Sequence, residues 1–359
     1  MATTYYFLPT RNLFGEDSVQ EAGALMQSLG GKKALIVTDS FLASSGMAAS
    51  IQEILQKAEV HSVVFGGAEP NPKDTNVVSG LEVFRKGNCD SIISLGGGSS
   101  HDCAKAIGLV ASNGGNIRDY EGVDKSTKPM CPMIAINTTA GTASELTRFC
   151  VITDKERHVK MSIVDWFLTP NVAVNDPVLM VGMPPALTAA TGMDALTHAI
   201  EAYVSTNTTP MTDACAAQAI RLVSKYLRKA VANGKDMEAR EGMAYAQYLA
   251  GMAFNNAGLG YVHAMAHQLG GFYSLPHGEC NAILLPHVES FNLISRLDRF
   301  VRIAQMMGEC TDGLSERAAA ELAISAIKTL SKDVGIPTTI TELAARYVKA
   351  IDPRDIPAM

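Results

Sequence analysis

The sequence of 359 residues lacks the features that mark several classes of protein. No apolar run approaches the roughly 20 residues that a membrane-spanning helix needs. The first nine residues lack the basic and apolar regions of a secretory signal. There is no excess of basic residues either, because 30 lysines and arginines face 36 acidic residues, for a net charge of −6. We therefore expect a cytoplasmic protein that binds neither membranes nor nucleic acid.

The cysteines are scattered along the chain. There are seven cysteines with no CxxC pair, and an odd number without regular spacing argues against both a disulfide framework and a zinc–thiolate site. We expect the thiols to be reduced and to pack mostly as small apolar groups. Hydrophobic residues, in contrast, make up 47% of the chain and charged residues 18%, which favours a large folded core. At about 150 residues per domain, the length predicts about two domains.

The order of predicted elements changes near Pro184. Before it, short β-branched runs alternate with segments of helical periodicity, which is typical of a parallel sheet with helices on both faces. After it, only long helical patterns follow. We therefore predict an α/β dinucleotide-binding domain over residues 1–184 and an all-α domain over residues 185–359, with a ligand between them. The predicted strands cover residues 34–38, 62–65, 91–95, 133–137 and 172–175.

A glycine-rich segment, SLGGGSSHD at 94–102, follows one of these strands and opens a helix. Its three glycines remove side chains, so backbone N–H groups can approach a phosphate closely. The helix N-terminus adds partial positive charge. A tight turn between strand and helix would explain the same pattern, but the position after a buried strand favours phosphate binding.

Two more segments predict contacts with a dinucleotide. Asp39 ends the strand at 34–38, where a carboxylate can accept both ribose hydroxyls of NAD and would repel a 2′-phosphate. A helix N-cap is a compatible alternative. The segment 137–145, NTTAGTASE, also follows a strand. Its small hydroxyl side chains are suited either to donating hydrogen bonds to a phosphate or to capping a helix.

Histidine and aspartate gather in the second half. Asp194 and His198 are four residues apart on a predicted helix, as are His263 and His267, so each pair shares one helix face. Imidazole nitrogen and carboxylate oxygen suit Zn²⁺ or Fe²⁺, although a single such pair can also be structural. With His277, the pairs predict four ligands and leave His267 to relay a proton. Beside a dinucleotide that carries the electrons, such a metal acts as a Lewis acid.

Together these residues resemble the iron-containing (group III) alcohol dehydrogenase family, and within it the 1,3-propanediol, ethanol and methanol dehydrogenases. The resemblance runs through most of the chain. It rests on LGGGSSHDCAK at 95–105, INTTAGTASE at 136–145, LTAATGMDALTHAIEA at 187–202, AGMAFNNAGLGYVHAMAH at 250–267 and LPHG at 275–278.

The resemblance implies a Rossmann-like N-terminal domain and a helical C-terminal domain, in the fold shared with dehydroquinate synthase. It implies NAD, Fe²⁺ with Zn²⁺ as an alternative, and a homodimer or larger homo-oligomer. The family's metal ligands fall on Asp194, His198, His263 and His277, and its second-sphere histidine falls on His267. Its cofactor contacts fall on Asp39, Asn71, Gly97, Gly98, Ser99, Asp102, Thr138, Thr139, Thr142 and Lys160.

Three hypotheses for function follow. The first is a metal-dependent alcohol dehydrogenase or aldehyde reductase that uses NAD on short primary alcohols or diols, with Phe149 and Phe254 as walls of a small apolar pocket. The second is a lyase of the dehydroquinate-synthase type, whose phosphorylated substrate would need several lysines or arginines near the metal. The segments around Asp194, His263 and His277 contain none. Because relatives continue for about another helix or two, the third is a shortened NAD-binding protein without activity.

Overall fold

The computed structural model describes residues 5–8, 11–157, 159–352 and 355. The chain divides into two compact units. The first, here called the α/β unit, comprises residues 9–139 and 144–180. The second, here called the helical unit, comprises residues 1–8, 140–143 and 181–359. Most of the chain before residue 181 therefore forms one unit, and all of the chain after it forms the other.

A six-stranded parallel sheet forms the centre of the α/β unit. The strands are rich in valine, isoleucine and alanine, and two central ones, β4 and β6, are buried along their whole length. This is the pattern of a parallel sheet covered on both faces. All five predicted runs are strands of this sheet, which confirms the predicted α/β class. In spatial order the strands are β1 (Arg11–Phe14), β9 (Val172–Asn175), β6 (Met133–Asn137), β4 (Ser91–Gly96), β2 (Lys33–Val37) and β3 (His61–Phe65).

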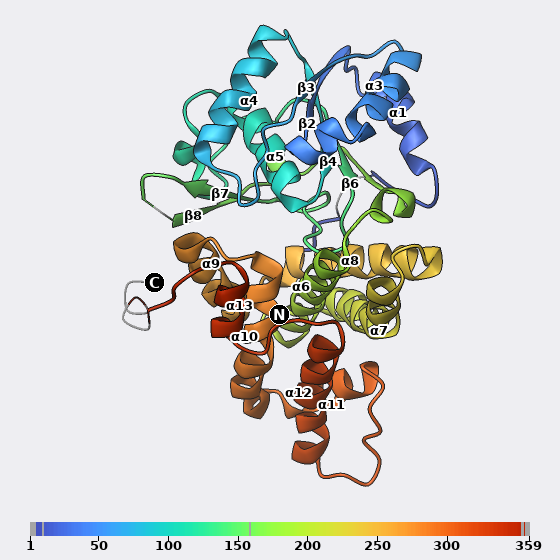
Figure 1. The fold of residues 1–359 in the computed structure, drawn as a ribbon, viewed down its shortest axis with the longest axis vertical. Helices are drawn as coiled ribbons and strands as arrows, with labels where there is room; N and C mark the ends of the chain where they lie inside the picture. Colours follow the sequence, from blue (N-terminus) through green and yellow to red (C-terminus); the bar gives the residue numbers. More distant parts are fainter. Residues whose placement is uncertain (1–4, 9–10, 158, 353–354, 356–359) are drawn as a thin grey trace. The chain divides into compact units, whose positions relative to one another are not determined.

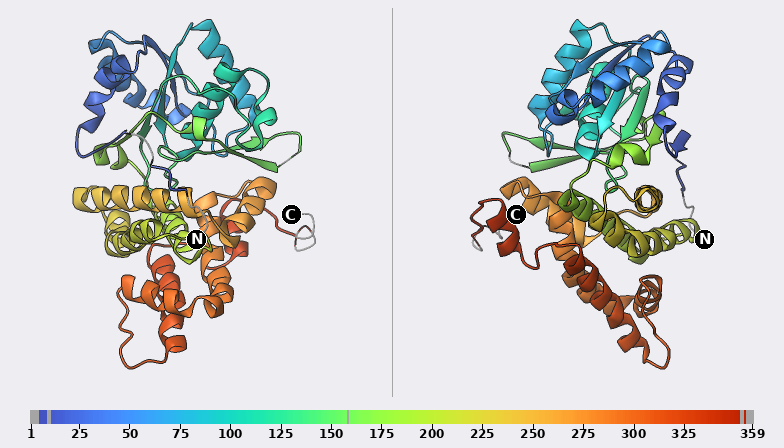
Figure 2. Two further views of the ribbon diagram at one scale, coloured as in Figure 1. Left: turned by 180° about the vertical axis from the view of Figure 1, so that it is seen from behind. Right: turned by 45° about the vertical axis from the view of Figure 1, so that its right-hand side comes forward.

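Helices cover both faces of this sheet (Figure 2). Alternate side chains of a strand point to opposite faces, so Ala34 and Ile36 share one apolar core with α1 and α3, whereas Leu35 and Val37 share another with α4 and α5. Because the strands are parallel, the loops that follow β2, β4 and β6 lie along one edge of the sheet. The helices of this unit are α1 (Ala22–Ser28), α2 (Ser40–Ser44), α3 (Met47–Lys57), α4 (Asp74–Lys86) and α5 (Gly98–Asn113).

A small three-stranded sheet completes the α/β unit. Two of its strands, β7 and β8, form an antiparallel hairpin, and β5 pairs in parallel with β8. Alternate residues of the hairpin, among them Cys150 and Ile163, are buried in the core that α4 and α5 share. This packing fixes the hairpin on the unit and thereby positions Lys160, a predicted cofactor residue. The strands are β5 (Gly122–Val123), β7 (Phe149–Asp154) and β8 (Val159–Val164).

The helical unit is built around α6. Its described residues form no strand, which confirms the all-α composition expected after Pro184. Helix α6 contacts α7, α8 and α10 (Figure 1), and most of its side chains are buried. It begins at Pro185. Proline has no backbone N–H, and the first turn of a helix would not use that N–H in a hydrogen bond within the helix. The helices are α6 (Pro185–Val204), α7 (Pro210–Ala232), α8 (Met237–Ala257), α9 (Tyr261–Tyr273), α10 (His277–Asn292), α11 (Leu297–Met306), α12 (Glu316–Asp333) and α13 (Ile340–Arg346).

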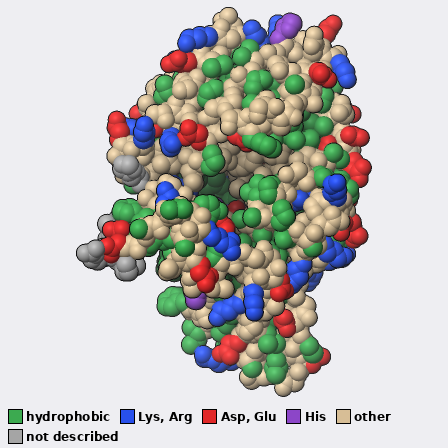
Figure 3. Space-filling model, in the orientation of Figure 1, with side chains coloured by type: hydrophobic (Ala, Val, Ile, Leu, Met, Phe, Trp, Pro, Cys, Tyr) green, Lys and Arg blue, Asp and Glu red, His purple; other side chains and the backbone are tan. Residues whose placement is uncertain are grey.

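The surface and the cysteines agree with the composition. None of the seven cysteines forms a disulfide, and Cys89, Cys103, Cys150 and Cys280 are buried. On the face drawn in Figure 3, acidic and basic side chains are interspersed. Within the part of the chain that the structure describes, no helix combines the length and the apolar character needed to cross a membrane.

Candidate metal centre and cofactor loops

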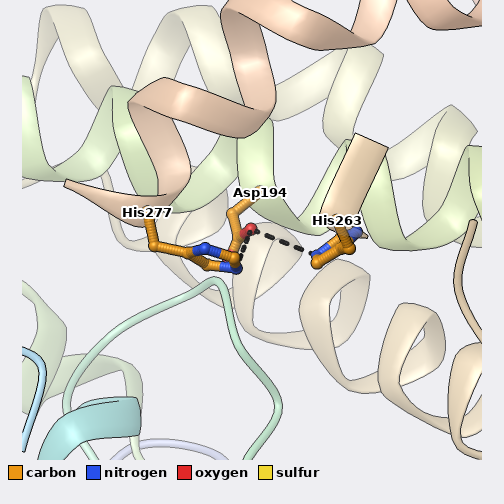
Figure 4. A group of neighbouring side chains, drawn as sticks. All are labelled: Asp194, His263 and His277. Carbon is orange, nitrogen blue, oxygen red and sulfur yellow. Dashed lines mark ion pairs between the residues drawn. The ribbon is translucent and has the colours of Figure 1, made fainter. Parts of the chain in front are cut away.

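Three predicted ligands meet in the helical unit: Asp194 of α6, His263 of α9 and His277 of α10 (Figure 4). One carboxylate oxygen and one nitrogen from each imidazole lie within 4.8 Å of one another. Asp194 Oδ1 is 3.8 Å from His263 Nε2 and 3.7 Å from His277 Nε2. Asp194 and His263 are buried and His277 is half-buried, so two of the three side chains are shielded from water.

Close packing of α10 against α6 brings His277 to Asp194. Gly278 follows His277 in the first turn of α10, and a Cβ at this position would lie 2.4 Å from the carbonyl oxygen of Ala190. A larger residue would therefore force the two helices apart. Since Ala190 lies one turn before Asp194 on α6, the glycine permits the approach that places the imidazole beside the carboxylate.

Hydrogen bonds determine which nitrogen of His263 faces Asp194. His263 Nδ1 lies 2.5 Å from Glu201 Oε2. An ionised carboxylate can only accept, so Nδ1 carries a proton, and in the neutral ring Nε2 is then the nitrogen that has the lone pair. Burial raises the pKa of Glu201, but His263 and the backbone N–H groups of Gly260 and Val262 outweigh that effect and hold it below its ordinary value. Glu201 is therefore ionised at neutral pH, as this assignment requires.

The three cluster atoms all lie within hydrogen-bond distance of the side chain of Asn281. Asn281 Nδ2 donates to Asp194 Oδ1 at 2.7 Å, and the same nitrogen lies 3.0 Å from His263 Nε2 and 3.2 Å from His277 Nε2. Two imidazole nitrogens and a carboxylate oxygen form a donor set that Fe²⁺ and Zn²⁺ both accept. These residues therefore fit a divalent metal ion.

His198, the fourth predicted ligand, is adjacent to this cluster but outside the group of atoms that meet within 4.8 Å. It lies one turn after Asp194 on α6. Its ring stacks on Phe254 at a centroid distance of 4.4 Å and on His263 at 4.5 Å. Burial lowers the pKa of His198 to about 4, so the ring is neutral at pH 7, the form that binds metals. Its role as a ligand stays a prediction.

His267 lies one turn after His263 on α9 and faces the same cluster. Its ring centroid is 5.1 Å from that of His277 and 6.2 Å from that of His263. The side chain is half-buried, so it borders the metal centre while keeping access to solvent. This position suits the predicted relay of a proton.

The glycine-rich loop lies at the carboxyl edge of the parallel sheet. It joins β4 to α5, and Gly97 is the N-cap of α5, so Gly98 and Ser99 lie in the first helical turn. A Cβ at Gly97 would lie 2.8 Å from the side chain of Thr139, and Thr138 N donates to the carbonyl oxygen of Gly96 at 3.0 Å. The loops that follow β4 and β6 therefore contact each other, and no side chain caps the N-terminus of α5, a geometry that suits a phosphate.

Asp102 points back into the α/β unit. Its carboxylate accepts hydrogen bonds from Ser144 Oγ at 2.7 Å and from the backbone N–H of Val151 at 3.0 Å, and burial raises its pKa. Lys105, one turn later and fully buried, donates to Ser144 Oγ and to the carbonyl oxygens of Thr147 and Phe149. Asp102 thus anchors α5 to β7 and to the loop after β6.

The other predicted cofactor residues occupy loop and strand ends. Asp39 is the N-cap of α2, and its Oδ1 accepts from Leu42 N at 2.8 Å, so the capping role uses one of its two oxygens. Lys160 Nζ donates to Asn71 Oδ1 at 2.8 Å, which brings these two residues together.

Thr142 lies in segment 140–143, which belongs to the helical unit. A Cβ at the neighbouring Gly141 would lie 2.8 Å from Thr191 Cβ of α6. This segment therefore packs closely on the helix that carries Asp194.

Comparison with known proteins identifies the family. The pattern of the iron-containing alcohol dehydrogenases matches residues 9–177, and the pattern of the C-terminal part of that family matches residues 188–352. The chain belongs to the iron-containing alcohol dehydrogenase family.

Curated relatives and solved structures agree with this assignment. The chain is 56% identical over 343 residues to 1,3-propanediol dehydrogenase of Citrobacter freundii, covering 95% of this chain and 89% of that protein. It is 53% identical to NAD-dependent methanol dehydrogenase of Bacillus methanolicus, covering 96% and 90%. A solved 1,3-propanediol oxidoreductase, 53% identical, superposes with a TM-score of 0.95 over 99% of this chain and 92% of that chain. The protein is therefore an oxidoreductase of the alcohol dehydrogenase type.

Two residues predicted to line the substrate pocket of this iron-containing alcohol dehydrogenase lie in different units. Phe149 begins β7 of the α/β unit, and Phe254 lies on α8 of the helical unit, where it stacks on His198. Both stay predictions as substrate contacts. The position of Phe254 beside the metal-centre histidines supports its assignment more directly.

The sequence prediction missed three residues with defined contacts: Glu201, Asn281 and Lys105. Glu201 lies seven residues after Asp194, and Asn281 lies four residues after His277, so each shares a helix face with a ligand. That spacing was the available signal. Nothing in the spacing of Lys105 indicates that it is fully buried.

Proposed function

We propose that this enzyme uses NAD to interconvert short-chain primary alcohols or diols with the corresponding aldehydes. The observation that carries the proposal is the meeting of Asp194, His263 and His277, each of which offers one ligand atom within 4.8 Å of the others. The names of two relatives support the choice of substrate and cofactor: one acts on 1,3-propanediol, and the other is an NAD-dependent enzyme for methanol.

We further propose that Asp194, His198, His263 and His277 hold the divalent metal. When bound, that ion would act as a Lewis acid toward the alcohol or aldehyde oxygen, and NAD would accept or supply the hydride. Fe²⁺ is the ion that the family name indicates, and Zn²⁺ accepts the same donor set.

The chain's own groups would position the reactants and handle the proton. The backbone N–H groups at the start of α5 would bind the pyrophosphate, and Asp39 would accept the ribose hydroxyls. His267 would take up the alcohol proton at a ring nitrogen and pass it toward solvent. The buried part of the cluster would exclude water from the reacting atoms.

A panel of alcohols with NAD⁺, monitored by NADH absorbance and combined with elemental analysis of freshly purified protein, tests the proposal. We expect steady NADH formation with 1,3-propanediol or butanol and about one divalent ion per chain. An absence of net NADH formation with every alcohol, together with conversion of a phosphorylated substrate, would favour the lyase alternative, because that reaction regenerates its cofactor. Complete inactivity with intact NAD binding would favour an NAD-binding protein without activity.

We propose that the enzyme acts in the cytoplasm as a homodimer or larger homo-oligomer. The absence of disulfides among the seven cysteines supports a reducing compartment. Sedimentation at several protein concentrations tests the state of assembly, and a monomer at all concentrations would contradict it.

A further inference from the structure

The buried carboxylate of Glu201 contacts a metal-centre histidine but is not one of the predicted ligands. We propose that Glu201 is a positioning residue that sets the metal affinity of the site by holding His263 in its ligating tautomer. This inference rests on the proposed metal site and concerns how tightly the site binds its ion.

The two oxygens of Glu201 contact two different parts of α9. Oε2 lies 2.5 Å from His263 Nδ1. Oε1 accepts from the backbone N–H of Val262 at 2.8 Å and lies 3.4 Å from that of His263. One carboxylate on α6 therefore holds both the first turn of α9 and the imidazole that projects from it.

A glycine makes this contact possible. A Cβ at Gly260, the N-cap of α9, would lie 3.0 Å from Glu201 Oε1. This distance is shorter than most contacts that Cβ atoms make in proteins. Without a side chain at this position, the carboxylate reaches the unpaired N–H groups at the helix N-terminus, where a negative charge is also favoured by the helix dipole. Glu201 itself is only 3% exposed, so its bonds are shielded from water.

The contacts of Glu201 require a side chain that accepts hydrogen bonds at both of its terminal atoms. The partners of Glu201 are all donors: His263 Nδ1 and the backbone N–H groups at the start of α9. A glutamine of the same shape would direct its NH₂ group either at Nδ1 or at the backbone N–H groups, and each orientation places a donor against a donor. If the NH₂ faces the ring, the proton shifts to His263 Nε2 and blocks the lone pair that faces Asp194. The carboxylate is thus needed to keep that nitrogen available.

Glu289 of α10 offers a matched control. It is fully buried and close enough to Glu201 for their charges to interact. Its hydrogen-bond partner, however, is Asn292 rather than His263. Glu289→Gln therefore replaces the same carboxyl group by the same carboxamide near Glu201, without altering the partner of the imidazole.

The test compares Zn²⁺ affinity, measured by competition with a chromophoric chelator, for the unmutated enzyme, Glu201→Gln and Glu289→Gln. Removing an outer partner of a ligating histidine typically weakens metal binding about 10–100-fold. We expect a loss in that range for Glu201→Gln and a change below about threefold for Glu289→Gln. In ¹⁵N-histidine spectra of the metal-free proteins, we also expect the His263 proton to move from Nδ1 toward Nε2 in Glu201→Gln alone. A purely structural role would not change this signal.

Two results would overturn the inference: Glu201→Gln that binds Zn²⁺ as tightly as the unmutated enzyme, or Glu289→Gln that loses as much affinity. If Glu201→Gln does not fold, Glu201→Asp replaces it, because its shorter side chain cannot hold both the helix turn and the ring. The Asp variant should then bind Zn²⁺ about tenfold more weakly or worse, and unchanged binding would overturn the inference. An unmutated enzyme that binds no Zn²⁺ would overturn this inference and the proposed metal site together. Tight binding in all three proteins would overturn the inference alone.

Discussion

The candidate metal centre and the glycine-rich cofactor loop provide binding groups in opposite ways. The metal centre is built from side chains on α6, α9 and α10, and each atom in it is fixed by a specific partner, such as Glu201 for His263. The loop between β4 and α5 depends instead on the absence of side chains. A side chain at Gly97 would collide with Thr139 and fill the space beside the backbone. Metal binding should therefore be lost when a side chain is removed from the metal centre, and cofactor binding should weaken when a side chain is added to the glycine-rich loop.

The largest expected effect tests the first half of this comparison. His263→Ala should abolish metal binding and lower turnover by about 10³-fold or more, because a Lewis acid contributes several kcal/mol to such a reaction and each 1.36 kcal/mol is a factor of ten. Elemental analysis and steady-state rates measure the two losses. His287→Ala is the control, since His287 is an exposed histidine on the helix that carries His277. A fully active, metal-free His263→Ala enzyme would refute the ligand assignment.

The next prediction concerns charge at the edge of the sheet. Asp39→Asn should lower the preference for NAD over NADP by about 10–100-fold, because a carboxylate facing a 2′-phosphate is a repulsive contact. The comparison is of kcat/KM with each cofactor. Asparagine caps helices as well as aspartate does, so the bond to Leu42 N is kept and only the charge is tested.

Asp39→Gly should relax the preference similarly while also removing the cap. The assignment of Asp39 is wrong if the unmutated enzyme already uses NADP as well as NAD.

A smaller effect tests the second half of the comparison. Gly97→Ala should raise the KM for NAD about tenfold and leave metal content unchanged, because the added Cβ would press on Thr139 at 2.8 Å and a misfit of that kind costs on the order of 1–3 kcal/mol. Gly182→Ala is the matched control, since no heavy atom lies within 4 Å of the position that its Cβ would take. Unchanged KM in Gly97→Ala would mean that the loop does not need its open space to bind the cofactor.

The same contrast explains what the sequence could predict. The strands and the candidate ligands could be predicted from patterns within short segments. Runs of β-branched residues predicted the sheet. The four-residue spacing of Asp194 and His198, and of His263 and His267, indicated a metal site. The supporting contacts depend on distant pairs. Gly278 fits against Ala190, and Gly260 leaves room for Glu201, only because particular helices pack together. Helical periodicity defines the buried face of each helix but not the residue that it meets on a neighbour, so these partners could not be read from the sequence.

Buried charge gives a last, smaller comparison between the two units. In the α/β unit, the fully buried Lys105 makes three hydrogen bonds and has Asp102 and Glu145 nearby as countercharges. In the helical unit, burial and the neighbouring Glu201 raise the pKa of Glu289 from 4.5 to about 8. Folded Glu289 is therefore protonated at pH 6 and ionised at pH 9, whereas in the unfolded chain it is ionised at both.

The folded state thus binds the extra proton, and stability falls as pH rises from about 4.5 through 8. Glu289→Gln, which mimics the neutral form at every pH, should remove this dependence. A pKa shift corresponds to about 1.36 kcal/mol of unfolding free energy per pKa unit, and relaxation of a buried site reduces this value. Between pH 6 and pH 9 we therefore expect the unmutated enzyme to lose about 1–2 kcal/mol more stability than Glu289→Gln. Denaturant unfolding at the two pH values measures it. Parallel pH profiles for the two proteins would show that Glu289 titrates normally and that the helical unit holds no uncompensated buried acid at this position.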